Sequence, residues 1–252
     1  MSIQKEPILE LRSINKSYGS VQALTDVSFK AYAGEVIGLV GDNGAGKSSL
    51  IKTISGVHNA DSGELFVDGV QRHWKSPHDS MAAGIETLYQ DSGLAPDLTI
   101  GSNIFLGREL TRKGPLGKFG FLDQKSMERQ ALEELEKVGI TVPLSKRTVS
   151  QLSGGQRQAV AIGRAAMWAQ HVIILDEPTN HLGARQSLEV LKVIRAARDH
   201  GLCVLFISHT LPHVLEVTDR IIVMRLGKVV KDSLTSEYTV ESLLGTITGL
   251  NT

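Results

Sequence analysis

The sequence predicts an α/β protein with a mixed, mainly parallel sheet and a separate antiparallel side sheet. Short apolar runs alternate with helical segments around residues 35–55 and again from residue 150 onward. Such runs are typical of strands buried on both faces, and their alternation with helices predicts parallel crossover connections. Residues 8–14 and 23–31 instead alternate partly between apolar and polar side chains. That pattern predicts antiparallel strands outside the main sheet.

Local signals place the elements of the first part of the chain. The connection NKSYGSVQ separates the first two strands, Gly56 ends a helix, and Asp68-Gly69 favours a tight hairpin turn. The elements expected there are strands at residues 8–14, 23–31, 35–40 and 84–90, a helix at 48–55 and a hairpin at 63–71.

The rest of the chain is helical at first and then alternates. Leu132, Leu135 and Val138 recur with helical spacing on one face, whereas RKGPLGKFGF is expected to be a loop whose basic residues are solvated. The elements expected there are helices at residues 99–107, 123–138, 154–169, 185–201 and 239–247, strands at 171–176 and 203–208, and a hairpin at 219–232. We expect one domain over residues 1–252, with a helical subdomain inserted at roughly 91–165.

Composition excludes several classes of function. Acidic and basic residues balance at 27 each, which gives no bulk argument for binding nucleic acid or an anionic surface. The single cysteine, Cys203, excludes an internal disulfide framework and suits a reducing compartment. The apolar runs are shorter than the ~18 residues typical of a membrane span, and the N-terminus lacks the apolar core of a secretory signal. We therefore expect a cytoplasmic protein that reaches a membrane through a partner.

The stretch GDNGAGKS, Gly41–Ser48, has the spacing of a phosphate-binding loop. Gly44 and Gly46 let the backbone turn tightly, so that successive N–H groups face phosphate oxygens. The following helix adds the positive end of its dipole. Lys47 is expected to reach the β- and γ-phosphates of a nucleotide, and the Ser48 hydroxyl to bind Mg²⁺.

Two adjacent acids follow the apolar strand VIIL. Asp176 stands where a phosphate-loop enzyme needs a second anchor for Mg²⁺. Glu177 is then expected at the mouth of the sheet, where a carboxylate can orient the water that attacks the γ-phosphate. Taken alone, the pair could also cap a helix, but its place beside a phosphate loop favours the catalytic interpretation.

The stretch LSGGQRQ, residues 152–158, opens a long helix and forms a second exposed set of donors. With both elements, and with IILDEP after the second, the sequence resembles the nucleotide-binding domain of ATP-binding cassette (ABC) proteins over essentially the whole chain. The resemblance implies a P-loop NTPase core, a helical signature subdomain, ATP and Mg²⁺ as ligands, and an ATPase activity.

The resemblance also assigns residues to the site. It implies a head-to-tail dimer in which ATP lies between the phosphate loop of one copy and the LSGGQ of the other. The catalytic residues it implies are Lys47, Gln90, Glu177 and His209, and the metal ligands are Ser48, Gln90 and Asp176. The nucleotide-binding residues it implies are Tyr18, Gly41, Asp42, Asn43, Gly44, Ala45, Gly46, Lys47, Ser48, Ser49, Ser153, Gly154, Gly155 and Gln156. Tyr18 corresponds to the aromatic residue that stacks on adenine, and His209 to the histidine that bonds the γ-phosphate.

Residues 84–109 resemble the bacterial monosaccharide importers of the ribose, xylose and fructose type. This implies a peripheral ATPase at the cytoplasmic face of the inner membrane, working with a membrane permease and indirectly with an extracytoplasmic sugar-binding protein, and no nucleic acid. The alternative is a soluble ABC ATPase that acts on ribosomes or nucleic acid, because EPTNHL is frequent there. Those proteins continue with an acid after the leucine, whereas this chain has Gly183. We therefore expect an importer, with looser communication between the two ATP sites of the dimer.

Overall fold

The computed structural model describes residues 6–90, 92–140 and 148–250. Its larger sheet has six strands in the order β10-β9-β3-β8-β7-β6. Neighbouring strands from β9 to β6 are parallel, and only the edge strand β10 is antiparallel to its neighbour. The strands are β3 (Val36–Gly41), β6 (Ile85–Leu88), β7 (Val172–Asp176), β8 (Cys203–Ile207), β9 (Arg220–Arg225) and β10 (Lys228–Leu234).

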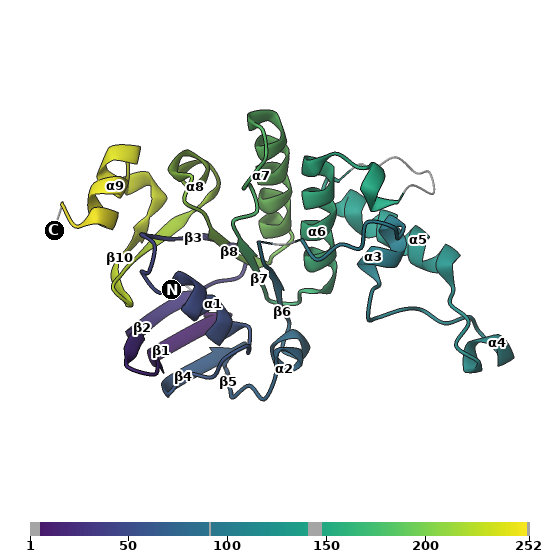
Figure 1. Ribbon diagram of the computed structural model, residues 1–252, viewed down its shortest axis with the longest axis horizontal. Helices are drawn as coiled ribbons and strands as arrows, with labels where there is room; N and C mark the ends of the chain where they lie inside the picture. Colours follow the sequence, from purple (N-terminus) through teal and green to yellow (C-terminus); the bar gives the residue numbers. More distant parts are fainter. Residues whose placement is uncertain (1–5, 91, 141–147, 251–252) are drawn as a thin grey trace, which may run out of the picture.

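The smaller sheet is antiparallel, has the order β2-β1-β4-β5, and lies below the larger one in Figure 1. Its strands are β1 (Leu9–Tyr18), β2 (Val21–Ala31), β4 (Ser62–Val67) and β5 (Val70–Arg72). The hairpin turn between β4 and β5 is made by Asp68 and Gly69, both with positive φ. The expected hairpin at this position is therefore confirmed.

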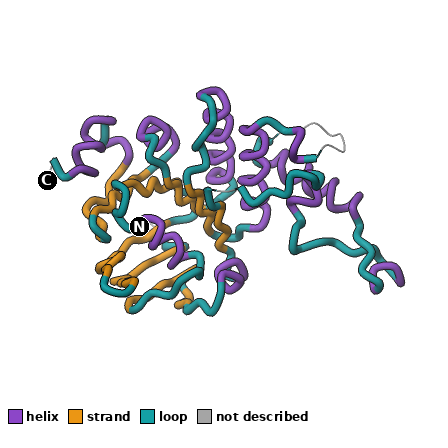
Figure 2. Tube along the Cα trace, in the orientation of Figure 1, coloured by secondary structure: helices purple, strands orange, loops and turns teal. Residues whose placement is uncertain are grey.

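Helices cover the other face of the large sheet and extend away from its β6 edge (Figures 1 and 2). Among the described residues, the α-helices between β6 and β7 in the chain are α3 (Ile100–Ile104), α4 (Pro115–Lys118), α5 (Gln124–Lys137) and α6 (Gly154–Trp168). The other α-helices are α1 (Lys47–Ile54), α2 (Pro77–Ala82), α7 (Ala184–Asp199), α8 (Leu211–Val217) and α9 (Val240–Thr248); two 3₁₀ turns are Val149–Gln151 and Thr235–Glu237. In the part of the chain that the structure describes, no helix combines the length and apolarity of a membrane span.

Two hydrophobic cores form because successive side chains of a strand point to opposite faces. On β7, Ile174 packs with α1 and the small sheet, whereas Ile173 packs with the helices of the opposite face. The alternation continues on β8, where Leu205 joins the first core and Phe206 the second. This two-sided burial explains why the parallel strands read as continuous apolar runs.

The α/β fold with its mixed sheet is confirmed, but two local expectations were wrong and two short helices were not anticipated. β1 and β2 run on to Tyr18 and Val21, so the connection is a tight turn and not the whole of NKSYGSVQ. The short helix α4 interrupts the loop expected at residues 112–121, and α2 and α8 were not anticipated. The helical face expected at residues 123–138 is confirmed, because Leu135 and Val138 are buried in the helical core and Leu132 packs against it; Met127 and Ala131 complete this face. The range 91–165 includes residues 91 and 141–147, which lie outside the described residues.

Candidate functional site

The site lies where the parallel strands end. β3, β6, β7 and β8 run in the same direction, so the loops after them meet at one edge of the large sheet. Asp176 pairs with Ile207 in register, and Leu39 pairs with the same Ile207 from the other side. The phosphate loop, the two acids and the segment with His209 therefore emerge at one level of this edge.

The phosphate loop is built by glycines that adopt backbone conformations unfavourable to other residues. Gly41, Gly44 and Gly46 have φ of 155°, 79° and 101°. A Cβ on Gly46 would lie 2.7 Å from the carbonyl oxygen of Ala23, so the β1–β2 hairpin packs directly under the loop. The exposed residues of the loop are Asp42, Asn43, Gly44 and Ser48. The loop thus presents its backbone and the Ser48 hydroxyl to solvent at the N-terminus of α1.

Lys47 lies in the mouth of this loop. Its Nζ donates to the carbonyl oxygens of Gly41 at 2.7 Å and Asp42 at 3.1 Å. Burial lowers the pKa of Lys47, while the negative charges of Glu177, Asp42 and Asp176 oppose that shift. The structure therefore brings the lysine and the two predicted acids into electrostatic contact, next to backbone donors that suit phosphate.

Glu177 and His209 form a pair across neighbouring loops. Glu177 has a φ of 52°, and its backbone N–H donates to the Ile207 carbonyl at 2.9 Å. Its Oε1 lies 2.8 Å from Nδ1 of His209, whose ring is largely exposed. The strained backbone turns the carboxylate out of the strand direction and toward the site. Two residues expected to act on the γ-phosphate are thus brought together.

Asp176 is the other acid of this edge. Burial and the charge of Glu177 raise its pKa, and Lys47 and Lys52 oppose the shift. Its carboxylate and the exposed Ser48 hydroxyl fit a Mg²⁺ site, because this ion commonly takes one or two carboxylates and completes its shell with substrate phosphates and water. Gln90 is exposed two residues beyond the end of β6, at the same edge of the sheet.

The signature segment opens α6 with a capping box. The Ser153 Oγ accepts from the Gln156 backbone at 3.3 Å, and the Gln156 Oε1 accepts from the Ser153 N–H at 3.0 Å. A Cβ on Gly155 would lie 2.9 Å from the Cβ of Gln186 on α7. A Cβ on Gly154 would make ordinary contacts with Leu182 at 3.5 Å and with the Oε1 of Gln186 at 3.9 Å. The neighbours of this segment are therefore α7 and the loop that follows Glu177.

Tyr18 lies at the end of β1 and packs edge-on against His58, with ring centroids 5.4 Å apart. The Nζ of Lys16 lies 5.6 Å from the Tyr18 ring centroid. The Tyr18 side chain is partly exposed, so one of its surfaces is open to a ligand. Tyr18 therefore lies beside the loop that follows the C-terminal end of α1, whereas Lys47 lies at the N-terminal end of that helix.

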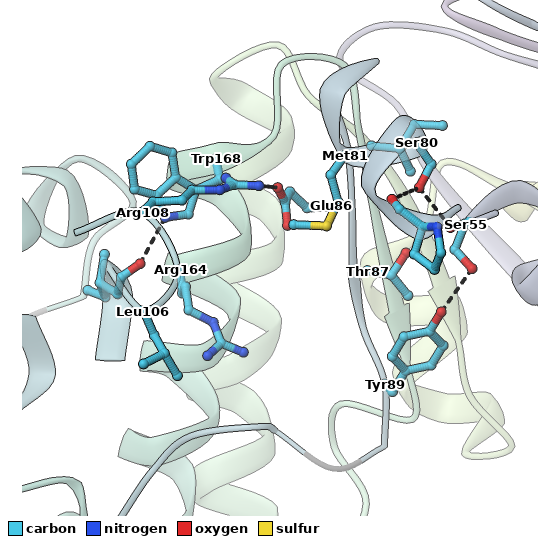
Figure 3. A pocket seen from close by; sticks show the side chains of 13 residues that line it. Ser55, Ser80, Met81, Glu86, Thr87, Tyr89, Leu106, Arg108, Arg164 and Trp168 are labelled. Carbon is cyan, nitrogen blue, oxygen red and sulfur yellow. Dashed lines mark hydrogen bonds and ion pairs between the residues drawn. The ribbon is translucent and has the colours of Figure 1, made fainter. Parts of the chain in front are cut away.

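A second feature is a groove between the β6 end of the large sheet and α6 (Figure 3), with a volume of about 230 Å³. Glu86 on β6 accepts from the Arg108 guanidinium at 2.7 Å, and burial raises the pKa of this carboxyl. Arg108 also stacks over the Trp168 ring at 4.7 Å. On the opposite wall Tyr89 and Ser55 share a hydrogen bond of 2.8 Å. We call this pocket, which is lined by Ser55, Glu86, Tyr89, Arg108 and Trp168 among others, the β6–α6 groove.

Sequence reasoning missed two connections at the site. Arg164 on α6 donates to the carbonyl oxygens of Ser92 and Gly93, each at 3.0 Å, so the segment after Gln90 is tied to the signature helix. His213 on α8 bonds the Thr179 hydroxyl at 3.2 Å and so holds the loop after Glu177. No sequence pattern marks either connection, because each joins segments that lie far apart in the chain.

The fold and the loops at this edge define a P-loop nucleotide hydrolase. The sequence matches the family model of the ABC transporter over residues 24–180, more than half of the chain. The chain belongs to this family. The solved structure of the ADP conformation of MJ1267, an ATP-binding cassette of an ABC transporter, has a TM-score of 0.80 and 27% identity, and the match covers 97% of this chain and 96% of that one.

Curated relatives narrow the class within the family. The fructose import ATP-binding protein FrcA of Rhizobium meliloti is 45% identical, with 97% of this chain and 95% of FrcA covered. The xylose/arabinose import ATP-binding protein XylG of Sulfolobus acidocaldarius is 43% identical, with 96% and 94% covered. The ribose import ATP-binding protein RbsA 2 of Escherichia coli O157:H7 is 35% identical over 95% of this chain, which spans 47% of RbsA 2. The expected family, ATPase class and importer function are confirmed, and a role on ribosomes or nucleic acid is not favoured.

Proposed function

We propose that this chain hydrolyses ATP to drive uptake of a monosaccharide through a separate membrane permease. The observation that carries the proposal is the meeting of Lys47, Glu177 and His209 at one sheet edge, next to a phosphate loop with exposed donors. The names of FrcA and XylG, both sugar import proteins similar to this chain over nearly their whole length, support the substrate class.

ATP would bind with its phosphates on the loop 41–48 and its adenine against Tyr18. Lys47 would exchange its bonds to two backbone carbonyls for bonds to phosphate oxygens. Ser49 follows Ser48 in the first turn of α1, where its backbone N–H adds to the donor set. When bound, Mg²⁺ would neutralise charge that develops on the phosphates, held by Ser48, Asp176 and, in our proposal, Gln90.

Glu177 would orient the attacking water and His209 would bond the γ-phosphate. In this structure the two side chains bond each other, so His209 must exchange its bond to Oε1 for one to phosphate. Such an exchange would free the Oε1 of Glu177 to accept from water when the phosphate is present. The pair therefore couples the water-orienting carboxylate to the arrival of substrate.

Each site would be completed by a second copy of the chain. Ser153, Gly154, Gly155 and Gln156 form a donor set whose neighbours are α7 and Leu182, while the phosphate loop packs on the β1–β2 hairpin. Each donor set suits one side of a triphosphate, and a head-to-tail homodimer would place the two sets on opposite sides of each ATP. Differential affinity of the closed dimer for ATP over ADP is what can do work on a partner.

The permease would dock at the β6–α6 groove, on the segment from Gln90 to Arg108. The groove combines apolar walls with a charged pair, the Glu86 carboxylate and the Arg108 guanidinium (Figure 3). Arg164 links it to the signature helix through Ser92 and Gly93. Docking there would locate the chain at the cytoplasmic face of the membrane, with the extracytoplasmic sugar-binding protein reached only through the permease.

We propose that the whole chain, residues 1–252, acts as one nucleotide-binding domain. The helical region at roughly 91–165 would be a subdomain inserted between β6 and β7. Support comes from the chain order of α3 to α6 and from the core that α3, α5 and α6 share with β7 and β8. A rotation of this region would move the signature and the groove together, because α6 contributes to both.

The Glu177→Gln variant tests the catalytic assignment. We expect the rate of ATP hydrolysis by the purified transporter to fall by about 10²-fold or more, because general-base assistance is lost. ATP affinity should stay within about twofold, since the amide preserves size and hydrogen bonding, and ATP should trap the dimer. Hydrolysis near the wild-type rate would refute the role of Glu177.

Uptake of labelled monosaccharides by vesicles that contain the permease and either wild-type protein or Glu177→Gln tests the transport assignment. We expect ATP-dependent uptake by the wild type and none by the variant. ATPase activity that never supports uptake of fructose, ribose, xylose or arabinose would refute the proposed substrate class while leaving the ATPase itself intact.

A further inference from the structure

An arm made of residues 110–122 projects from the helical region at the end of the molecule far from the C-terminus (Figure 1). It contains the short helix α4 and is reached through two extended connections (Figure 2). Its base is closed by a hydrogen bond from Asp123 N to Leu110 O of 2.7 Å and one from Arg112 N to Phe121 O of 2.8 Å. The arm is thus a defined hairpin and not a structureless loop.

The arm presents its large apolar side chains to solvent. The side chains that stand out are Leu116, Phe119, Phe121 and Leu122, with exposures of 48%, 81%, 54% and 40%. Single exposed apolar residues are ordinary on a protein surface, but four within seven residues of one projection are not. The backbone of the arm is tightly folded, since a Cβ on Gly117 would lie 1.7 Å from the Arg112 carbonyl oxygen.

The charge of the arm has one sign. Residues 111–122 include Arg112, Lys113 and Lys118 and no acidic residue, in a chain whose acids and bases balance overall. Exposed aromatic and aliphatic side chains mixed with Lys and Arg are the composition of segments that lie at the surface of an anionic bilayer. The sequence alone predicts solvated lysines here, and the exposed phenylalanines between them change that interpretation.

We propose that the arm is a membrane-surface anchor that binds anionic phospholipid directly, with Phe119 and Phe121 inserted between headgroups. The proposal rests on the proposed function for its location. The arm starts two residues after Arg108, which lines the groove proposed for the permease, so docking of the permease at that groove would bring the arm close to the bilayer. Lipid binding itself, however, is a property of this chain and needs no permease.

Sedimentation of the purified full chain with lipid vesicles tests the anchor. We expect at least tenfold stronger binding to vesicles of phosphatidylcholine with phosphatidylglycerol than to vesicles of phosphatidylcholine alone. Each cation near an anionic surface contributes about 1 kcal/mol, equivalent to roughly fivefold in affinity. The triple variant Arg112→Gln, Lys113→Gln, Lys118→Gln should therefore bind anionic vesicles on the order of 100-fold more weakly.

Two further variants distinguish lipid binding by the arm from nonspecific adsorption of the protein to vesicles. Phe119→Ser with Phe121→Ser should reduce binding at least tenfold while leaving its salt dependence in place. The matched control changes two exposed lysines and an exposed leucine on the edge strand β10, as Lys228→Gln, Lys231→Gln and Leu234→Ser, and should bind like the wild type. ATP hydrolysis without vesicles should be unchanged in the triple Arg/Lys variant, in the double phenylalanine variant and in the β10 control. Unchanged hydrolysis would show that all three proteins fold.

Equal binding of the arm variants and the wild type, or binding as strong to neutral as to anionic vesicles, would overturn the anchor. Binding that requires the permease would also overturn it and would identify the arm as a protein contact. These outcomes leave ATP hydrolysis and sugar uptake untouched, so failure of the anchor is distinguishable from failure of the proposed function.

Discussion

Two helices of this protein, α1 and α6, begin with glycines at proposed phosphate sites, but the glycines serve different purposes. Gly44 and Gly46 before α1 have positive φ, so they are needed for the shape of the loop itself. Gly154 and Gly155 are absent from the positive-φ residues, and Gly155 is needed because α7 approaches too closely for a side chain. One site is thus set by backbone conformation and the other by the packing of two helices.

The difference bears on how each site responds to change. The phosphate loop rests on the β1–β2 hairpin and keeps Lys47 bonded to its own carbonyls, so it is a self-contained receptor. The signature holds Ser153 and Gln156 in a capping box, and its position follows α7 and Leu182. Because Leu182 lies in the segment after Glu177, movement of that segment reaches the signature of the same chain. We infer that the signature is the adjustable partner of a fixed receptor.

The largest expected contrast is in nucleotide affinity. Lys47→Ala should weaken ATP binding by the isolated chain roughly 100-fold, because a charge-assisted bond to phosphate is lost in a half-buried site. Ser153→Ala should leave that affinity within about twofold, since the proposed contact belongs to the ATP of a second copy. Calorimetry measures both.

The rate of ATP hydrolysis is the measurement that complements nucleotide affinity. Ser153→Ala should lower the ATPase rate of the complete transporter despite normal binding by the isolated chain. A Ser153→Ala chain that binds ATP as weakly as Lys47→Ala would show that both donor sets act on one nucleotide within one copy. That result would refute the assignment of the two donor sets to different copies.

The next contrast is in stability at the phosphate loop. Gly46→Ala combines a φ of 101° with a Cβ 2.7 Å from the Ala23 carbonyl oxygen, and we expect a loss of about 3 kcal/mol or more in the free energy of unfolding. Gly44→Ala shares the strain, at a φ of 79°, but its Cβ meets nothing within 4 Å, so a loss of about 1 kcal/mol is expected. Urea unfolding without nucleotide distinguishes them. Equal losses would mean that close packing under the loop is unimportant.

The same comparison at the signature should give smaller effects. Gly155→Ala forces the new Cβ against Gln186, and we expect a loss of roughly 1–2 kcal/mol, because overpacking outweighs the better helix propensity of alanine. Gly154→Ala makes only an ordinary contact of 3.5 Å with Leu182 and should be neutral within about 0.5 kcal/mol. If both substitutions stabilise the protein, the closeness of α6 and α7 is not what requires glycine.

What the sequence predicts well is set by local chemistry. The phosphate loop, the acids after VIIL and the turn at Asp68-Gly69 each need particular residue types within a few positions, so pattern suffices. Contacts between distant segments leave no such pattern. The bond from Arg164 to Ser92 spans 72 residues, and nothing in either segment specifies the other.

Packing also decided the expectations that were wrong. β1 and β2 extend to Tyr18 and Val21 because β1 pairs with β2 and also with β4. The polar residues at their ends nevertheless have the composition of a loop. The exposure of Phe119 was equally hidden, because an aromatic residue in a basic segment can be buried or exposed, and only the projecting arm decides which. The sequence therefore predicts the chemistry of the sheet edge better than it predicts the surfaces around it.

The smallest expected effect is on the pH dependence of stability, and it concerns Asp176, the last residue of β7. Burial and the nearby Glu177 carboxylate raise the pKa of Asp176 in the folded protein. A carboxyl whose folded pKa lies above its unfolded value stabilises the fold when protonated, and this contribution is lost as pH rises through the folded pKa. At neutral pH the ionised carboxylate therefore destabilises the nucleotide-free protein.

Asp176→Asn should accordingly raise the melting temperature without nucleotide at pH 7, and the gain should shrink as pH falls through the raised pKa of Asp176. Asp68→Asn is the matched control, because it removes an exposed carboxylate at a turn where asparagine is equally favourable, and it should leave the melting temperature at pH 7 unchanged. Addition of Mg²⁺ and ATP should reverse the order, since the wild type gains binding energy that the variant lacks. A variant stabilised as much as the wild type by Mg²⁺ and ATP would show that Asp176 does not hold the metal.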